Sequence, residues 1–461
     1  MNDVTKLEYK KKNKLFLIKT AHFLICAALF YCAFLLFRYS EFPQERKASF
    51  RYNYFVAFLY IFLTAFFNRT YNSYLLGYSR IRGLVSAQFL SQFFSVGIIY
   101  IVVTIAWNRI RSPLIFILLL VVFVPINIIW SIEANKYYCK LNPPRKTILI
   151  YRNQRDKRRF GIITGKPTER LYKITKELQF DGDFDEIIDQ LEGFEAVFVA
   201  GINSRCRNGI LKHCQDHNIR GFFLPHVGDV ILQGADHIQS FDSPVLMARR
   251  KIVQPEYRVI KRIMDIIGSA IGLILLSPVF LITAIAIKAY DKGPVFYKQM
   301  RLTRDGRKFR IIKFRSMRPD AEKDGIARLS TGDQDDRITP IGRIIRKCRL
   351  DEIPQLINIL KGEMSIVGPR PERPEIAEQY YKTMPDFKLR LQVKAGLTGY
   401  AQIYGKYNSD PYEKLEFDLL YINQMNILTD LRMIFATFGI LFSKESTAGV
   451  EGITAMDYEE E

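Results

Sequence analysis

The sequence predicts a membrane protein with three parts: a bundle of four transmembrane helices, a small Rossmann-like α/β domain and a C-terminal domain with a re-entrant helix–break–helix. Three observations lead to this prediction. Four long apolar runs open the chain, short buried strands alternate with helices after them, and a fifth apolar run is broken at Ser277-Pro278. We place the three parts at residues 1–135, 146–250 and 255–461.

The first part is defined by four apolar runs, each close to the ~20 residues that cross the hydrocarbon core of a bilayer. The first run follows a lysine-rich lead-in, as a signal peptide would, but it is too long and lacks a small-residue cleavage site, so we interpret it as an anchor. Basic residues before the first run and after the fourth predict that both ends lie in the cytoplasm. The runs are 15–37, 52–68, 84–107 and 113–132.

The middle part, 146–250, has the character of a soluble domain, in which strands alternate with helices. Such alternation predicts a small parallel α/β sheet. The first strand is followed by "RNQRDKRRF" and not by a glycine-rich turn, so a dinucleotide site is not supported and we expect a structural or regulatory role. Strands are predicted at 147–151, 195–201, 219–225 and 243–249, and helices at 183–191 and 203–216.

The fifth apolar run, 260–293, decides on which side of the membrane the rest of the chain lies. Basic residues flank both of its ends, so both ends favour the same side. Pro278 removes an amide donor and breaks the helix, while the Ser277 hydroxyl can cap exposed backbone groups. We therefore predict a re-entrant helix over 260–290, with a kinked spanning helix as the alternative. The flanking residues are Lys261, Arg262, Lys288 and Lys292.

Composition narrows the partners of the chain. Its 461 residues carry a formal net charge of +20, which indicates phosphorylated substrates, an anionic membrane surface or nucleic acid. The apolar first part disfavours nucleic acid. The six cysteines form no C-x-x-C pair, so neither a zinc cluster nor a redox motif is supported and we expect free thiols.

The stretch "CRLDEIPQLINILKGEMSIVGPRPERPE" (348–375) places two carboxylates, Asp351 and Glu352, side by side in a basic region. Neighbouring side chains on a helix point about 100° apart, so the two do not form a shared-proton pair. One carboxylate can attack phosphorus and form an acyl phosphate, while the other holds Mg²⁺. Alternatively, Asp351 caps a helix that begins at "EIPQLINIL" and Glu352 favours its dipole. The pattern leaves both interpretations open.

Basic side chains surround this acid pair in the sequence and suit a diphosphate substrate. Arginine binds phosphate oxygens in pairs, and lysine acts as a point charge. The stretch "KFRIIKFRSM" alternates as a strand that would aim Lys313 and Arg315 to one face. The other bracketing residues are Arg346, Arg349 and Arg370.

Residues 255–461 resemble the bacterial sugar transferase family, the monotopic polyprenyl-phosphate phosphoglycosyl transferases that start exopolysaccharide, capsule or O-antigen repeat units. The whole chain is similar to the long form of that family, with four transmembrane helices, an α/β domain and a catalytic domain. The resemblance therefore implies an α/β monotopic catalytic domain. The matching stretches are "KRIMDI", the break at "SP", "GPVFYKQ", "KFRSM", "LDEIPQLINILKGEMSIVGPRP" and "AGLTGYAQI".

The resemblance also implies the chemistry. Asp351 would attack the β-phosphorus of a UDP-hexose, release UMP and hold the sugar phosphate until undecaprenyl phosphate takes it. Glu352 would help to bind Mg²⁺, and Ser277-Pro278 would be the break of the re-entrant helix. The protein would lie in the bacterial inner (cytoplasmic) membrane as a multi-pass protein with its catalytic domain facing the cytoplasm, and a homodimer is compatible with the long form. Lys313, Arg315, Arg346 and Arg370 would bind phosphates or the nucleotide.

Three points stay open at the level of sequence. Thr303 stands where many family members have glycine, which puts the geometry of that loop in doubt. The segment 431–444 is either an amphipathic helix in the membrane interface or part of the core. Other functions are also conceivable: a membrane glycosyltransferase that releases UDP and uses "DQDD" (333–336) as a metal site, a non-catalytic polysaccharide-assembly scaffold, or a transporter. No residue names the sugar.

Overall fold

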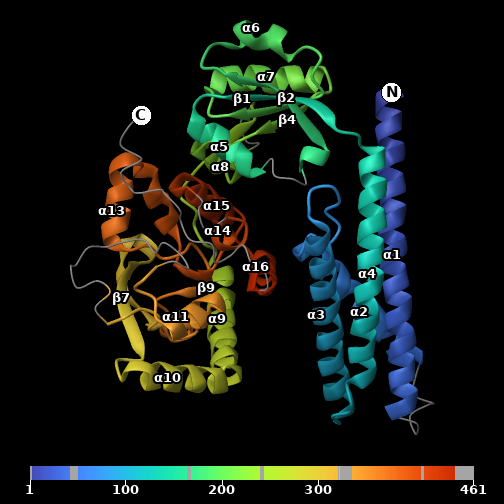
Figure 1. Ribbon diagram of the computed structural model, residues 1–461, viewed down its shortest axis with the longest axis vertical. Coiled ribbons are helices and arrows are strands. Elements are labelled where there is room, and N and C mark those ends of the chain that lie inside the picture. Colours follow the sequence, from blue (N-terminus) through green and yellow to red (C-terminus); the bar gives the residue numbers. More distant parts are fainter. Residues whose placement is uncertain are drawn as a thin grey trace. The chain divides into compact units, whose positions relative to one another are not determined.

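The computed structural model describes residues 3–41, 50–163, 168–238, 243–319, 321, 335–405 and 410–441. By its internal contacts the chain divides into two compact units, Met1–Pro225 and His226–Glu461. Figure 1 shows the helices and strands of both units.

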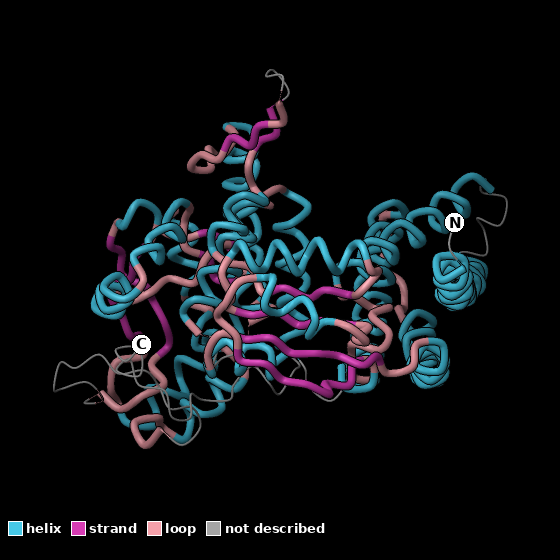
Figure 2. The backbone as a smooth tube through the Cα atoms, turned by 90° about the horizontal axis from the view of Figure 1, so that it is seen from above, coloured by secondary structure: helices cyan, strands magenta, loops and turns pink. Residues whose placement is uncertain are grey.

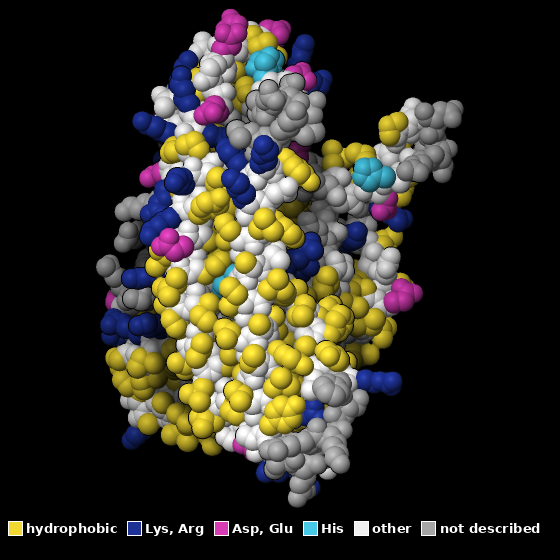
Figure 3. Space-filling view, turned by 90° about the vertical axis from the view of Figure 1, so that its right-hand side faces the viewer, with side chains coloured by type: hydrophobic (Ala, Val, Ile, Leu, Met, Phe, Trp, Pro, Cys, Tyr) yellow, Lys and Arg dark blue, Asp and Glu magenta, His cyan; other side chains and the backbone are white. Residues whose placement is uncertain are grey.

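The first unit begins with four long helices at the positions of the four apolar runs. They share a core rich in aromatic side chains, in which the rings of Phe30 and Tyr60 stack with centroids 3.9 Å apart. Their outer surface carries a broad band of hydrophobic side chains, visible in Figure 3. The helices are α1 (Asp3–Glu41), α2 (Phe50–Thr70), α3 (Ile81–Trp107) and α4 (Leu114–Leu141).

Three of these helices, α1, α3 and α4, are long and apolar enough to cross a membrane. Helix α2 has 21 residues, but polar side chains such as Asn53 and Arg69 near its ends lower its hydropathy. The helical bundle is thus confirmed, and crossing by α2 stays a prediction.

A four-stranded parallel sheet follows in the order β2-β1-β3-β4. Helix α7 covers one face, where Cys206 and Ile210 pack on Ile148; α5 covers the other face with Phe160. Figure 2 shows these strands among helices. The bounds are β1 (Arg145–Tyr151), α5 (Gln154–Ile163), η2 (Thr168–Arg170), β2 (Tyr172–Gln179), α6 (Phe184–Ile187), η3 (Ile188–Leu191), β3 (Ala196–Ala200), α7 (Ser204–Asp216) and β4 (Arg220–Phe223).

The stretch 243–249 was predicted as a buried strand of this sheet, and that prediction is wrong. Its strand β6 (Val245–Met247) pairs in antiparallel fashion with β5 (Asp236–Ile238), and Val245 and Leu246 are exposed. Helix α8 (Val227–Gln233), which precedes these strands, packs its valines against Leu415 and Leu419. The chain after α8 therefore belongs to the second unit and does not return to the parallel sheet.

The second unit has two hydrophobic clusters as its core. Along the chain, strands β7 to β10 alternate with short helices. Strands β7 and β8 form an antiparallel hairpin, and β9 pairs in parallel with β10. The remaining elements are β7 (Phe296–Leu302), η4 (Arg304–Gly306), β8 (Lys308–Phe314), α11 (Pro340–Lys347), η6 (Leu350–Glu352), α12 (Gln355–Lys361), β9 (Ser365–Val367), α13 (Pro374–Thr383), η7 (Pro385–Gln392), β10 (Gly396–Thr398), α14 (Tyr400–Ile403), α15 (Pro411–Asn423) and α16 (Ile427–Leu441).

The fifth apolar run folds as two helices, α9 (Pro255–Leu275) and α10 (Ser277–Asp291), which bend by 62°. The Ser277 hydroxyl donates to the carbonyl oxygen of Ile274 at 2.7 Å, and Pro278 lies in the first turn of α10, where its missing N–H has no helical partner to lose. The predicted break at Ser277-Pro278 is confirmed, and the bend suits either a re-entrant turn or a broken span.

The structure bears on two points that the sequence left open, the loop at Thr303 and the helix after residue 426. The Thr303 hydroxyl donates to the carbonyl oxygen of Glu363 at 3.0 Å and accepts from the amide of Ala395 at 3.1 Å, so threonine fits this loop. Helix α16 buries Met433 in the core and exposes Phe438, which supports core packing for its inner face. Residues 442–444 lie outside the described residues.

Candidate active site

The two adjacent carboxylates lie on a single 3₁₀ turn, η6, between α11 and α12. Arg349, which precedes the turn, has a left-handed backbone conformation with φ of 53°. Residues other than glycine rarely adopt this conformation, and it is often found at functional sites. The tight turn therefore presents Asp351 and Glu352 together.

The helix-cap interpretation of Asp351 is wrong. Helix α12 begins at Gln355, and its N-cap position is Pro354, whose side chain accepts no hydrogen bond. Asp351 lies three residues before that position, so its carboxylate does not cap the helix. An interpretation in which Asp351 is chemically active remains.

Glu352 is held by two cations. Arg370 Nη2 donates to Glu352 Oε1 at 2.8 Å, and Lys313 Nζ lies 3.5 Å from the same oxygen. The side chain of Glu352 is only 14% exposed. Burial acts to raise its pKa, but Arg370, Lys313 and Arg349 together outweigh burial and hold the pKa of Glu352 below its usual value. Glu352 is therefore ionised at neutral pH.

Asp351 has the opposite tendency. Burial raises the pKa of Asp351 to about 6, an increase that Lys313 opposes and the charge of Glu352 supports. No donor among the described residues makes a hydrogen bond to its carboxylate. Environments that push apart the pKa values of two neighbouring acids are typical of sites where the acids have different tasks.

Three predicted cations meet at the acid pair from three elements. Lys313 lies near the end of β8, Arg346 lies in the last turn of α11, and Arg370 follows β9. All three stabilise the charged form of Asp351. Burial lowers the pKa of Lys313, although Glu352 counteracts this effect.

Arg315 lies elsewhere. It is one residue beyond the end of β8, so strand alternation does not set its direction, and its guanidinium pairs with Asp291 at the end of α10. The side chain is 6% exposed. The structure therefore does not bring Arg315 into the group around Asp351.

A buried ionic network, which sequence reasoning missed, fixes the loop that carries Arg370. Arg390 Nη2 donates to the carbonyl oxygen of Arg370 at 2.8 Å and forms an ion pair with Asp418 Oδ2 at 2.8 Å. Arg301 Nη1 donates to the carbonyl oxygen of Pro371 at 3.1 Å. These residues are far apart in sequence and follow no short motif, so no local signal could have revealed them.

Charged side chains of α9 form hydrogen bonds with β9, next to the Arg370 loop, and with the end of α12, the helix that follows the acid pair. Asp265 Oδ1 accepts from the amide of Ile366 in β9 at 2.9 Å, on the side of Arg370. Arg262 donates to the carbonyl oxygens of Ile359 and Leu360 at 2.6 Å each, at the end of α12, on the side of the acid pair. Helix α9 thus holds the site together.

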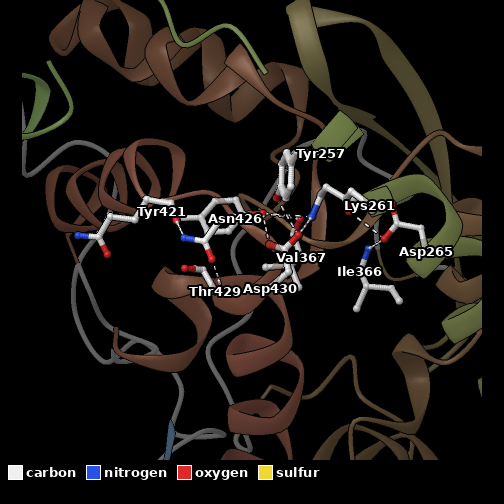
Figure 4. A network of polar contacts seen from close by, with 11 residues as sticks. Tyr257, Lys261, Asp265, Ile366, Val367, Tyr421, Asn426, Thr429 and Asp430 are labelled. Carbon is white, nitrogen blue, oxygen red and sulfur yellow. Dashed lines mark hydrogen bonds and ion pairs between the residues drawn. The ribbon is translucent and has the colours of Figure 1, made fainter. Parts of the chain in front are cut away.

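Figure 4 shows further polar contacts of α9, around Asp430. Lys261 Nζ and the Tyr257 hydroxyl each donate to Asp430 Oδ2 at 2.7 Å, and the Tyr421 hydroxyl donates to Asp430 Oδ1 at 2.8 Å. Asp430 lies in the first turn of α16 and is 1% exposed. Helix α9 is therefore bonded to α15 and α16 as well.

The donor set limits how a metal could bind. No group of three His, Cys, Asp or Glu side chains suited to a metal occurs in the part of the chain that the structure describes. The contacts of the Glu352 side chain fall on Oε1, so Oε2 can face a cation. In "DQDD", Asp335 pairs with Arg337 at 2.7 Å; residues 333 and 334 lie outside the described residues.

Fold and site together define a membrane-associated protein whose second unit holds an acid pair among cations that suit phosphate. The sequence comparisons agree. A family described as "Bacterial sugar transferase" matches residues 256–444. A UDP-glucose:undecaprenyl-phosphate glucose-1-phosphate transferase of Caulobacter vibrioides is 34% identical over 191 residues, 40% of this chain and 71% of that protein. The chain belongs to the bacterial sugar transferase family.

Two further relatives are longer than the protein of Caulobacter vibrioides. A UDP-N-acetylgalactosamine-undecaprenyl-phosphate N-acetylgalactosaminephosphotransferase of Aeromonas hydrophila is 40% identical over 40% of this chain. A UDP-glucose:undecaprenyl-phosphate glucose-1-phosphate transferase of Klebsiella pneumoniae is 40% identical over 45% of it. The chain spans 44% and 43% of their lengths, respectively.

Proposed function

We propose that this chain transfers a sugar 1-phosphate from a UDP-sugar to undecaprenyl phosphate and releases UMP. The single observation that carries the proposal is the acid pair on η6, in which Glu352 is clamped by two cations and Asp351 accepts no hydrogen bond from the described residues. The activities for which the relatives are named support the same reaction class.

The reaction would proceed in two balanced steps. A carboxylate oxygen of Asp351 attacks the β-phosphorus of the UDP-sugar, the bond from that phosphorus to the bridging oxygen breaks, and UMP leaves with the electron pair. An oxygen of undecaprenyl phosphate then attacks the same phosphorus and expels the Asp351 carboxylate. Each step is a displacement at phosphorus by an oxygen nucleophile, so no oxidant or reductant is needed.

The cations around Asp351 would hold the diphosphate. Arg346 and Arg370 present planar guanidinium groups that bind phosphate oxygens, and Lys313 adds a point charge. Once the donor enters, these cations compensate the charge that develops on the leaving UMP. Arg315, which is engaged by Asp291, has no such role in this proposal.

Magnesium fits this site only together with substrate. Mg²⁺ prefers one or two carboxylates plus phosphate oxygens, and Oε2 of Glu352 together with the donor diphosphate supplies this set. When bound, the ion would neutralise charge between the anionic nucleophile and the diphosphate.

The membrane placement follows from the acceptor. Undecaprenyl phosphate carries its phosphate at the membrane surface, and the donor is soluble. A re-entrant α9–α10 pair would seat η6 at that boundary with the second unit on the cytoplasmic side of the inner membrane, in agreement with the flanking basic residues. The relatives name different sugars, namely glucose and N-acetylgalactosamine, so the sugar is to be measured.

The test measures nucleotide release from a panel of UDP-hexoses by membranes that contain the wild type or Asp351→Asn, with Mg²⁺ and undecaprenyl phosphate. We expect the wild type to release UMP from one or a few sugars and the variant to lose this release almost completely, because an amide is a poor nucleophile. Release of UDP, or full activity of the variant, would contradict the proposal.

A further inference from the structure

A large cavity in the second unit lies apart from the acid pair. It has a volume of about 830 Å³, within the range of about 300–1,000 Å³ that small-molecule sites occupy. Its apolar side chains include Leu302, Leu391 and Leu419, and the ring of Tyr381 also lines it. Apolar walls with a few polar groups are the usual composition of a ligand site.

This cavity is distinct from the proposed donor site. Lys308, at the start of β8, lines the cavity, and Lys313, near the end of the same strand, contacts Glu352. Five residues of a strand at 3.3–3.4 Å each separate the two by about 17 Å. Figure 1 shows the partner strand β7 running between α10 and α13, so the two sites lie toward opposite ends of the β7–β8 hairpin.

The cavity is lined by cations that acids do not neutralise. Asp305 pairs with Arg250, and Glu378 is the other acid in the lining. In the described part of the chain, Lys251, Lys308 and Lys388 have no acidic partner; Lys388 lies over the ring of Tyr381 at 5.0 Å. Together with Arg249 and Arg250, the three lysines outnumber the two acids of the lining, Asp305 and Glu378, so the cavity has a positive potential.

We infer that this cavity binds a phosphate-bearing organic anion of about nucleotide size, with its phosphate at the three lysines and its apolar or aromatic body against the leucines and Tyr381. Lysine ammonium groups recognise phosphate as point charges, and the cavity volume admits a body larger than an inorganic ion. The site goes beyond the proposed transferase reaction and does not depend on it.

Occupancy of the cavity has a physical route to the acid pair. Strand β8 carries Lys308 at the cavity and Lys313 at Glu352. The segment from Arg370 to Pro374 likewise links the two sites, because Arg370 binds Glu352 and Pro374 lines the cavity. A ligand in the cavity would therefore contact both elements that carry donor-site cations.

The experiment measures equilibrium binding of the fluorescent nucleotide mant-ADP to the full chain in phosphatidylcholine nanodiscs. We expect saturable binding that Lys308→Glu/Lys388→Glu weakens by about tenfold or more, since two charge-assisted contacts are reversed. Lys382→Glu is the matched control: this lysine is exposed on neighbouring α13 but does not line the cavity, and its variant should bind as the wild type does.

Three results would overturn the inference: no saturable binding, equal weakening by the Lys382→Glu control, or loss of binding in Arg346→Glu, which reverses a donor-site cation and would place the probe at the donor site. Binding of a synthetic acidic peptide of residues 442–461 in place of the nucleotide would also overturn it. If phosphatidylglycerol in the nanodisc competes with mant-ADP, the phosphate belongs to a lipid head group; if it does not, the ligand is soluble. Both of these last results support the site.

Discussion

At the scale of residues, the site depends on a contrast between two neighbouring acids. Glu352 accepts a hydrogen bond from Arg370 and pairs with Lys313, so it stays ionised. Asp351 is buried beside that negative charge, and its pKa rises to about 6. A nucleophile with a pKa slightly below neutral pH is ionised when needed and more reactive than a fully stabilised carboxylate.

This contrast predicts the pH dependence of the first step. A protonated Asp351 cannot attack phosphorus, and because its pKa is raised to about 6, the reactive fraction falls as pH drops through that value. We expect kcat/KM for the UDP-sugar to be level above about pH 7 and to fall about tenfold per pH unit well below 6. A pH profile of UMP release measures this.

The assignment of that pH dependence has its own control. The two acids interact, so the midpoint belongs to the pair. Lys313→Met removes a cation that lowers the pKa of Asp351 and should move the midpoint upward. A wild-type rate that stays constant as pH falls below 6, or a midpoint that moves downward in the variant, would contradict the role of Asp351 as the ionised nucleophile.

Sequence reasoning at this scale predicted that the acids and three of the cations lie together, because they occur in compact stretches around "LDE", "KFRSM" and "GPRP". It failed for Arg315 because one residue past the end of a strand is enough to change a side chain's direction. It could not find the Arg390–Asp418 pair, since contacts between residues distant in sequence depend on how helices pack.

At the scale of elements, α9 combines an exposed apolar surface with contacts that support the site. One part of its surface exposes isoleucines such as Ile267 and Ile271. Its charged start bonds to β9 through Asp265 and to the end of α12 through Arg262. The same helix therefore connects α12, which follows η6, with β9, which precedes the Arg370 loop.

The bond from Arg262 to α12 gives a stability prediction. Arg262→Gln removes a cation and its two hydrogen bonds to carbonyl oxygens at the end of α12, so we expect the free energy of unfolding to fall by about 2 kcal/mol. Thermal unfolding in one detergent measures it. Arg258→Gln is the matched control, because Arg258 is exposed on the same helix. Equal stability of the two variants would show that Arg262 does not hold α12.

The break between α9 and α10 gives a topology prediction. Ser277→Ala/Pro278→Ala restores an amide donor and favours a continuous helix, which is long enough to span the bilayer. We expect residues after the break then to reach the outer side. Cys348, which is exposed, reports this by labelling with a membrane-impermeant maleimide in a chain that keeps only this cysteine. Labelling of the unsubstituted break from outside would refute the re-entrant topology.

The elements themselves were predicted unevenly. Long apolar helices and buried strands such as β1 and β3 have strong patterns, and they form where expected. Strand β2 was missed because "YKITKELQ" exposes alternate charged residues and reads as polar. Strand β6 forms, but its partner could not be predicted from the nearby sequence, because the pairing depends on how α8 packs against α15.

At the scale of the whole molecule, the important boundary is Pro225–His226, which separates two compact units. Helix α8 belongs to the second unit, where Val227 and Val230 are buried against Leu415 and Leu419. Asn423 Nδ2 also donates to the carbonyl oxygen of Val230 at 2.6 Å. The match with the relative from Caulobacter vibrioides covers 71% of that protein but 40% of this chain.

These facts predict that the second unit functions alone if it is cut in the right place. A fragment of residues 226–461 keeps α8 and should release UMP in detergent with undecaprenyl phosphate. A fragment of residues 254–461 keeps the whole family match but loses α8. Two buried valines contribute about 1.5–3 kcal/mol each, so the shorter fragment should be less stable by about 3 kcal/mol or more.

Thermal unfolding of both fragments in the same detergent compares their stability, and UMP release compares their activity. The matched control is Leu232→Ser in the longer fragment, since Leu232 lies on α8 but is exposed and should leave stability unchanged. If the two fragments unfold at the same temperature, α8 is dispensable and the boundary at Pro225 has no energetic meaning. If the longer fragment folds but releases no UMP, the first unit supplies something the reaction requires, and the acid pair alone does not account for the activity.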